Sequence, residues 1–446
     1  MSKLGSLISR HRHANWAFLD QSIVSGSNFI IGILLARFLG PEAFGVFVLL
    51  QSVMLYVNSF QGALIFQPMM SAAPQLVEQE RSKYLQGVFA MQLILGLMLG
   101  LAVTLLAVGA HVLGLIHMAG LDSMTVAAVV CAMLTFQLQD WQRRYYFVHE
   151  KARAAFFIDI ISYGGQVALL GTAFVLGRLD VATGFWIIAA ASLTSFCIGF
   201  LHHSLRPVFA HARDVLREGW RTGRDYLVAW QFQWLGSQGV FMVGASLVGT
   251  HAVGGVRATQ NIVGPINILF LAMDNLIPVA AARRYGKSGL DALSRYLWKI
   301  TLWGTLLLAP VLILLSVFAV PLMGLLYGES YVAFASLVYW QALYIFIQFY
   351  LRQAFFFLRT VKATGVILRS GIIMAAFSIA IASFTVDSYH ATGLMFALLG
   401  GVSASLLYSA WSARKLAISL RQEKKERQDF DFNNNQLKKM GAGGKA

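Results

Sequence analysis

A stripe of polar side chains runs along residues 256–281, an otherwise apolar segment. Its members recur at i, i+3, i+4 and i+7 intervals, which places them on one side of a helix: Arg257, Gln260, Asn261, Asn267 and Asp274. An ionisable group that faces lipid costs at least ~2.5 kcal/mol near the bilayer centre. The stripe is therefore predicted to line a cavity, where it would hydrogen-bond a polar cargo, or a helix–helix contact.

Three other apolar segments have a polar face of the same kind. They carry Asp20 and Asn28 in residues 14–38, Gln51 and Asn58 in residues 43–66, and Gln231 and Gln238 in residues 225–249. Hydrogen bonding between neighbouring helices, worth about 0.6 kcal/mol per bond on average, would explain any single amide. Four such segments together favour a water-filled central cavity.

The segments that carry these residues must cross a membrane. The chain has 446 residues, of which 57% are hydrophobic and only 12% charged, whereas a soluble domain has roughly 25% charged residues. A helix of about 20 apolar residues crosses the hydrocarbon core. The sequence predicts an all-α polytopic membrane protein with about twelve transmembrane helices, at residues 14–38, 43–66, 85–109, 124–148, 154–177, 181–203, 225–249, 256–281, 296–323, 331–357, 363–386 and 391–413.

The basic residues indicate how these helices are oriented. All of the 35 Lys and Arg residues except Arg37, Arg178 and Arg257 fall on the side of the N-terminus. By the positive-inside rule both termini are predicted to be cytoplasmic, in a bacterial inner membrane. The net charge of +15 then reflects topology, and we expect no nucleic-acid partner. Cys131 and Cys197 lie in apolar runs, as small core residues do, and we expect no metal or cofactor.

An internal repeat is visible at an offset of 209 or 210 residues. Residues 36–51 align with residues 245–260, matching Gly40 with Gly249 and Gln51 with Gln260. Six helices per half give both halves the same orientation, related by an axis along the membrane normal. We predict two pseudo-symmetric six-helix bundles at 1–203 and 225–413, an amphipathic cytoplasmic linker at 204–224, and a basic tail at 414–446 that is partly disordered.

The string LGPEAFGVF, residues 39–47, resembles the polysaccharide-transporter family. This family holds the O-antigen and exopolysaccharide flippases, within the superfamily of the multidrug and toxin extruders and the lipid II flippase. The specific similarity covers residues 15–70, and the two helices that lipid II flippases usually add have no room here. The resemblance implies a central cavity that opens to either side in turn and moves an undecaprenyl-pyrophosphate-linked oligosaccharide outward.

The same resemblance implies partners and binding residues. Arg257 and Arg37 would bind the pyrophosphate, since a diphosphate needs cationic partners. Membrane lipid, the lipid-linked glycan, and a glycan polymerase and glycosyltransferases of the same pathway would be the partners. Separately, the position of Asp20 and Asp274 within the spans makes them the candidate coupling carboxylates of an H⁺ or Na⁺ gradient that would drive the movement.

Two other functions stay open. In cation-coupled multidrug extrusion, Asp20 and Asp274 would hold a cationic substrate instead. A membrane-embedded glycan polymerase or ligase would need a sizeable outer domain, and the outer connections here are short. His117 and Asp122 match an acyltransferase spacing, H-x4-D, but so short a pattern is expected by chance. We therefore expect a protein that is not an enzyme.

The remaining ionisable groups in the helices are expected to be structural. Arg352 lies near the cytoplasmic end of its helix, where a long side chain can reach the membrane surface. The charged group from Asp140 to Arg153 brackets a connection and is predicted to be a solvated, salt-bridged turn, with contact to an anionic headgroup as the alternative. Asp159 and Gln166, two turns apart, form a weaker candidate for a buried pair.

Overall fold

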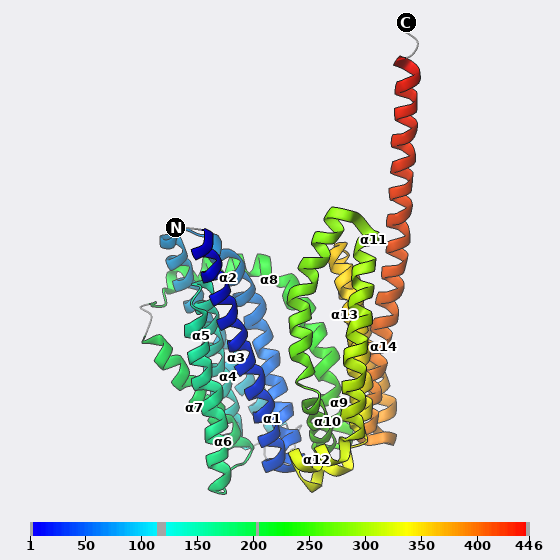
Figure 1. Cartoon of the computed structure of the whole chain (residues 1–446). Helices are drawn as coiled ribbons and strands as arrows, with labels where there is room; N and C mark the ends of the chain where they lie inside the picture. Colours follow the sequence, from blue (N-terminus) through cyan, green and yellow to red (C-terminus); the bar gives the residue numbers. More distant parts are fainter. Residues whose placement is uncertain (1–2, 114–121, 202–204, 443–446) are drawn as a thin grey trace.

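The computed structural model describes residues 3–113, 122–201 and 205–442, and every regular element within them is a helix (Figure 1). His117 lies outside the described residues. The first half contains α1 (Lys3–Gln61), η1 (Gly62–Phe66), α2 (Gln67–Ala72), η2 (Ala73–Gln75), α3 (Glu78–Val112), α4 (Ser123–Val148), α5 (Ala152–Asp159), η3 (Ile160–Gly164), α6 (Gly165–Val175) and α7 (Val181–Phe200).

The second half begins with a short 3-10 turn and ends with the longest helix. It contains η4 (Phe209–His211), α8 (Ala212–Trp234), η5 (Leu235–Gly239), α9 (Val240–Val248), α10 (Thr250–Ile262), α11 (Ile266–Val317), α12 (Ala319–Tyr327), η6 (Glu329–Phe334), α13 (Leu337–Thr360) and α14 (Thr364–Ala442). The elements η1, η3 and η5 are single π-helical turns inside longer helices.

Three of the long helices are broken inside by one residue with a positive φ. The breaks fall at Gly40 in α1, Gly289 in α11 and His390 in α14. Divided there, the helices follow the twelve predicted spans in order, so the chain is an all-α polytopic membrane protein. By length and hydropathy alone, seven of the described helices can cross a membrane, or eight if α10 and the start of α11, bent by 65°, form one span.

The helices gather into two groups. Figure 1 shows α1 to α7 on one side and α9 to α14 on the other, with α8 crossing between them at one end. Within the first group, α4 packs closely on α7, where the Tyr146 hydroxyl donates to the Gly199 carbonyl at 2.9 Å. Within the second, the hydroxyls of Ser370 and Ser405 lie 2.6 Å apart and join the two halves of α14.

The linker differs from its predicted boundaries. Residues 212–234 form the single helix α8, so the amphipathic linker runs without interruption into the seventh predicted span. Its glycines allow close packing on η1, because a Cβ at Gly223 would lie 2.2 Å from the Ala63 carbonyl oxygen and one at Gly219 would lie 2.5 Å from that of Leu64.

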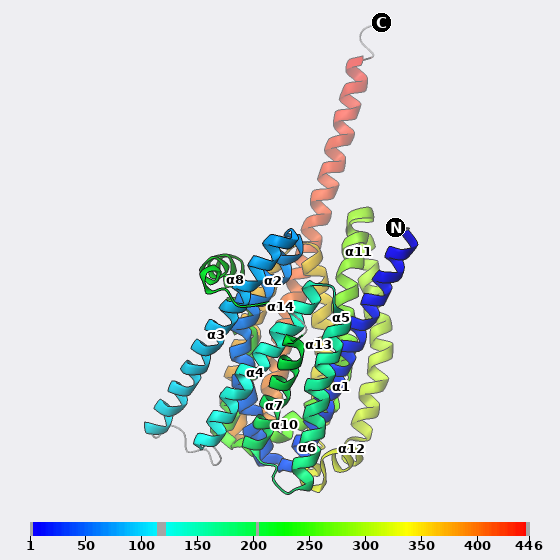
Figure 2. The ribbon, with the colours of Figure 1, turned by 90° about the vertical axis from the view of Figure 1, so that its left-hand side faces the viewer.

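The last helix runs through most of the predicted tail. α14 continues as a helix to Ala442 and projects well beyond the other helices (Figures 1 and 2). Its sequence is rich in Glu, Lys, Arg and Gln, which favour helix, and it extends a helix already packed in the bundle, so no new nucleus is required. Arg421 forms an ion pair with Asp291 of α11 at 3.0 Å near the base of this extension.

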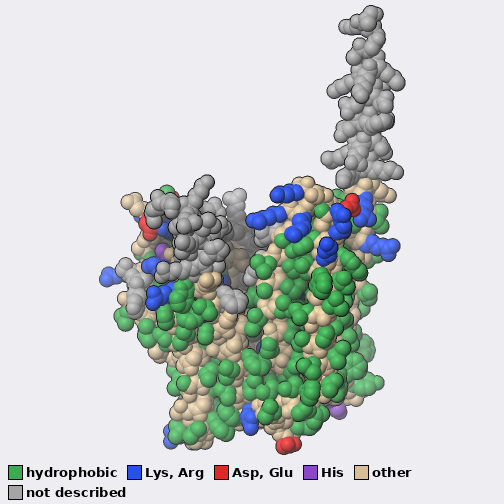
Figure 3. Space-filling model, in the orientation of Figure 1, with side chains coloured by type: hydrophobic (Ala, Val, Ile, Leu, Met, Phe, Trp, Pro, Cys, Tyr) green, Lys and Arg blue, Asp and Glu red, His purple; other side chains and the backbone are tan. Residues whose placement is uncertain are grey.

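The two ends of the bundle differ in charge. Lys and Arg side chains gather at the end where both termini lie, which we call the basic end (Figure 3). α12 lies at the opposite end, which we call the far end, and Arg37, three residues before the Gly40 break, bonds its Leu325 carbonyl. Between the two ends, large apolar side chains such as Leu106 and Leu306 are exposed, as expected for a surface that faces lipid.

Candidate functional site

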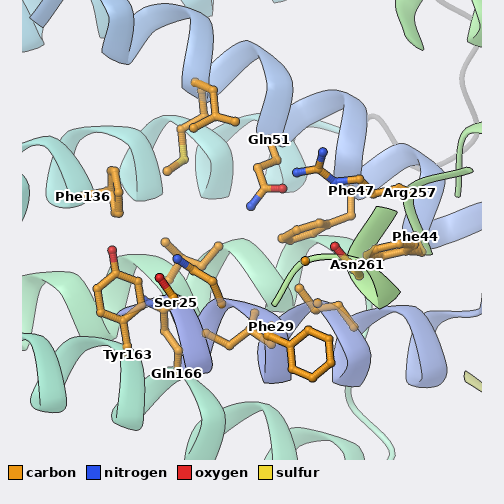
Figure 4. A pocket seen from close by; sticks show the side chains of 18 of the residues that line it. Ser25, Phe29, Phe44, Phe47, Gln51, Phe136, Tyr163, Gln166, Arg257 and Asn261 are labelled. Atoms are coloured by element: carbon orange, nitrogen blue, oxygen red, sulfur yellow. The ribbon is translucent and has the colours of Figure 1, made fainter. Parts of the chain in front are cut away.

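A cavity of about 390 Å³ lies between the two groups of helices. Its walls come from both halves of α1 and from α4, η3, α6, α7, α10 and α11 (Figure 4). Five residues predicted from their polar faces line it together: Asn28, Gln51, Arg257, Asn261 and Asn267. The cavity therefore combines amides and one guanidinium from helices far apart in the sequence.

Arg257 supplies the positive charge of the cavity. Its Nη1 donates to the Oε1 of Gln260 at 3.1 Å, so Gln260 orients the guanidinium from the same helix. The lining residues that the structure describes include no aspartate or glutamate. Asn261 can approach α1 closely because residue 32 is a glycine. A Cβ at this position would lie only 2.6 Å from the Asn261 Nδ2.

Several lining residues lie outside the predicted set. Ser25, Tyr163 and Gln166 add polar atoms, and Phe29, Phe44, Phe47 and Phe136 add aromatic surface. Gln166 is buried, at 4% exposure, as the sequence predicts for a polar residue of an apolar span. The aromatic residues carry no sequence signal that separates a cavity wall from ordinary core, because both are apolar.

A second cavity of about 300 Å³ adjoins the first. It lies between α1 and α11 and shares Ser25, Phe29, Gly264 and Asn267 with the first cavity. Pro265, Ile268 and Leu271 also line it, so it is more apolar than the first. Together the two cavities offer one polar and one apolar compartment.

Three predicted site residues lie outside the cavity, and two of them form contacts between helices instead. Gln231 donates to the Ser59 hydroxyl at 2.9 Å, and the Oε1 of Gln238 accepts from the Ser52 hydroxyl at 3.1 Å. Both contacts join α1 to the helix that contains α8 and η5. Asn58 lies on the same stretch of α1 and is partly buried, outside the cavity lining. Gln231 and Gln238 thus follow the alternative of hydrogen bonding between helices, whereas the Oδ1 of Asn58 is buried without a hydrogen-bond partner among the described residues.

Arg37 lies at the far end and not in the cavity. Its Nη1 donates to the Leu325 carbonyl of α12 at 2.8 Å, and its side chain is otherwise exposed. One residue earlier, the Ala36 carbonyl accepts from the Tyr331 hydroxyl at 2.9 Å. The prediction of Arg37 as a cavity cation was wrong, because α1 breaks three residues later and has already left the cavity.

Asp20 belongs to a buried cluster of charges. Its Oδ2 lies 2.5 Å from the Arg143 Nη2, and the Arg143 Nε lies 2.7 Å from the Asp159 Oδ2. Gln139 donates to the other oxygen of Asp159 at 2.7 Å. Both aspartate side chains are fully buried. Arg143 was predicted to lie in a solvated turn, but α4 continues to Val148 and carries it inside the bundle.

The predicted Asp159–Gln166 pair does not form. Both residues are buried, but Gln166 contacts Ser162 at 3.5 Å while Asp159 binds Arg143 and Gln139. The reason lies in η3, a π-helical turn between the two residues that changes their relative rotation around the helix.

Asp274 is also matched by an arginine. Arg352 of α13 forms an ion pair with it and lies over the Phe270 ring, 4.7 Å from its centroid. The two charged side chains are 28% and 31% exposed, whereas Asp20 and Asp159 are fully buried. The interpretation of Arg352 as a residue that reaches for the membrane surface was therefore wrong. Within the described residues, no group of His, Cys, Asp and Glu could hold a metal ion.

Comparison with known proteins agrees with this arrangement of helices. The family model MatE matches residues 229–385, and no curated protein matches the chain. A solved structure described as the inward-facing conformation of a multidrug resistance MATE transporter of the MOP superfamily has 14% identity and a TM-score of 0.71, covering 90% of this chain and 96% of its own.

Two further structures have the same fold. An outward-facing conformation of a multidrug resistance MATE transporter has 14% identity and a TM-score of 0.60, over 93% of this chain and 96% of its own. A MOP superfamily transporter from Pyrococcus furiosus, whose description says that reverse polarity of its binding pocket suggests a different function, has the same identity, coverage and TM-score. The protein therefore has the fold of the MATE transporters of the MOP superfamily.

Proposed function

We propose that this protein is an alternating-access exporter of an amphipathic substrate in a bacterial inner membrane, with the basic end in the cytoplasm. The charge asymmetry of the two ends supports this orientation. In that orientation the contacts at Arg37 and Tyr331 close the cavity on the outer side. The TM-score is higher with the inward-facing MATE structure, 0.71, than with the outward-facing one, 0.60, which supports a cavity that is closed on the outer side.

The chemistry of the cavity supports a polar substrate that is neutral or anionic. Arg257 is the cation of the cavity, and its surroundings are amides and hydroxyls, with no carboxylate among the described lining residues. A cationic substrate would place its charge beside this guanidinium without a counterion, which is costly in a low-dielectric site. A sugar diphosphate offers the acceptors that arginine and amides bind.

The sizes of the two cavities fit an amphipathic molecule. Pockets of roughly 300–1,000 Å³ take a drug-sized group, so the polar cavity of about 390 Å³ would hold a head group. The adjoining cavity between α1 and α11 would hold the first part of an apolar chain. We therefore propose a lipid-linked oligosaccharide as the cargo, with a glycan polymerase and glycosyltransferases as pathway partners.

The comparisons favour a second candidate, a cation-coupled multidrug exporter. The MatE match and the multidrug transporters of the same fold support export of unrelated small molecules. In this function the aromatic wall formed by Phe29, Phe44, Phe47 and Phe136 would bind apolar drugs. Asp20 and Asp274 would not be free for a cationic drug, because each is bound to an arginine.

The energy source under either function would be an ion gradient. The buried cluster has two carboxylates, Asp20 and Asp159, and one guanidinium, Arg143. A net negative charge buried in a membrane protein is costly, and one proton on the two carboxylates would remove it. We therefore propose that this cluster exchanges a proton during transport, and that the one-to-one pair of Asp274 and Arg352 does not.

Reconstitution tests the proposal. In liposomes, the wild type and an Arg178→Ala control are expected to translocate a fluorescent polyprenyl-diphosphate sugar, whereas Arg257→Ala loses most of this activity and Arg257→Lys keeps part of it. Arg178 is a fitting control because it is an exposed arginine at the far end, outside both cavities. Export of a dye by wild type, with no movement of the lipid-linked sugar, would instead support the multidrug candidate.

A further inference from the structure

Two helix breaks at the far end have the same geometry. Gly40 has φ 76° and ψ 170°, and Gly249, which is 209 residues later, has φ 83° and ψ 172°. Residues other than glycine rarely adopt this combination. Each glycine starts a new helix at the following residue, Pro41 in one half and Thr250 in the other. The internal repeat is thus present as backbone structure at these two positions.

The helices that follow these breaks touch each other across the two halves. A Cβ at Gly45 would lie 1.8 Å from the Thr250 carbonyl oxygen, and one at Gly254 would lie 2.0 Å from the Pro41 carbonyl oxygen. Gly45 and Gly254 are 209 residues apart, as are Pro41 and Thr250, so the contact is reciprocal. The pseudo-two-fold axis therefore passes between Gly45 and Gly254. No side chain fits there, and the two backbones meet directly.

This contact lies beside one end of the polar cavity, which we call its floor, because Phe44 is next to Gly45 and lines the cavity. Leu35, before the Gly40 break, and Phe47, after it, line the same cavity. On the outer side, Tyr331 is fully buried, as is Ala36, whose carbonyl its hydroxyl binds. Arg37 bonds the Leu325 carbonyl beside them. Among the described residues, the Gly45–Gly254 backbone contact and these two hydrogen bonds to main-chain carbonyls join the two halves at the far end.

We propose that the Gly45–Gly254 contact is the outer gate, which separates when the cavity opens to the far side, with Tyr331 and Arg37 as its latches. The inference rests on the proposed alternating access. A contact on the pseudo-two-fold axis keeps both halves equivalent as they separate, so it opens by rocking the halves as rigid bodies. Glycines at both positions make the closed form possible, because any side chain would force the backbones apart.

The test measures which side of the membrane reaches the cavity floor. In a background with Cys131→Ala and Cys197→Ala, a single Leu35→Cys thiol is treated with an impermeant maleimide. The parent protein is expected to react in inside-out vesicles and to remain near background in intact cells. Gly45→Leu and Gly254→Leu should reverse this pattern, with labelling gained from outside and reduced from inside.

Matched controls separate a gate from general disruption. Gly171 of α6 also lies toward the far end, and a Cβ added there would have no atom within 4 Å, so Gly171→Leu should label like the parent. Tyr331→Phe removes only the hydroxyl bond to Ala36 and should give a smaller gain from outside, even if the leucine variants fail to fold. The assay needs no cargo, so it is independent of the substrate proposed above.

Two results would overturn the proposal. One is unchanged labelling from outside in a folded Gly45→Ala or Tyr331→Phe protein, with folding checked by gel filtration. The other is increased labelling from both sides at once, which indicates a leak and not a gate. If the labelling reverses as expected but no substrate is transported in liposomes, the gate stands and the proposed function fails.

Discussion

Asp20 on α1 accepts a hydrogen bond of 2.5 Å from Arg143 on α4, although 123 residues separate them in the chain. The same guanidinium reaches Asp159 at 2.7 Å. Arg143 thus connects three predicted transmembrane helices through one side chain that is 16% exposed. Three buried charges in this arrangement affect both stability and transport.

Removal of Arg143 should destabilise the protein strongly. Arg143→Met leaves two buried carboxylates without a partner, and breaking a buried ion pair from one side costs about 3–5 kcal/mol. Thermal unfolding in detergent should show a clearly lower midpoint. The neighbouring Arg144 is a matched control, since its pair with Asp140 is 36% exposed on the arginine side and Arg144→Met should cost less than about 1 kcal/mol. Equal effects of the two substitutions would contradict the buried cluster as a stabilising element.

Asp159 and Asp274 should differ in their effect on coupling. With a pH gradient imposed across liposomes, wild-type transport should be faster than without one. Asp159→Asn removes the excess carboxylate and should abolish this acceleration while keeping the ion pair between Asp20 and Arg143. Asp274→Asn should retain it, because Asp274 and Arg352 are balanced one to one. Loss of the acceleration only in Asp274→Asn would move the coupling site to the second half of the chain.

His149, at the connection after α4, should make stability depend on pH. Burial lowers the pKa of His149, and the positive charges of Arg81 and Lys151 act in the same direction. In the unfolded chain the pKa is about 6.5. Below that pH the unfolded state binds more protons at this site, so the free energy of unfolding decreases as the pH falls.

The measurement is the unfolding midpoint of the wild type and of His149→Gln at about pH 7.5 and about pH 5.5. Between these two pH values the unfolding midpoint of His149→Gln should fall less than that of the wild type. The lowered pKa would be contradicted if the unfolding midpoint of the wild type rose on acidification and His149→Gln abolished that rise.

The polar residues of the site illustrate how far sequence reasoning reaches. Asn28, Gln51, Arg257, Asn261 and Asn267 stand out in the sequence because polar faces in apolar helices cannot face lipid, and all five line the cavity. The same argument selects Gln231 and Gln238, which bond Ser59 and Ser52 between helices. Both outcomes remove an amide from lipid, and helical spacing alone does not distinguish them.

Charged residues are harder to place. Asp20 and Asp274 stand out in the sequence as carboxylates within the spans, and they are buried or partly buried, but their partners, Arg143 and Arg352, have the sequence positions of cytoplasmic surface residues. A position near a helix end suggests exposure only when the neighbouring helices end at the same level. Here Asp20 of α1 and Asp274 of α11 lie beside these arginines and form ion pairs with them.

The sequence by itself determined the class of fold, the order of the spans and the positions where the chain turns. Long apolar runs leave a helix as the only way to satisfy the backbone in lipid, and glycines such as Gly40 and Gly249 permit the backbone that each turn needs. The tertiary structure alone decided which polar groups share the cavity, that Arg143 joins Asp20 to Asp159, and that Gly45 meets Gly254. Those contacts depend on how helices from distant parts of the chain pack together, and helical periodicity carries no information about which neighbour each face will meet.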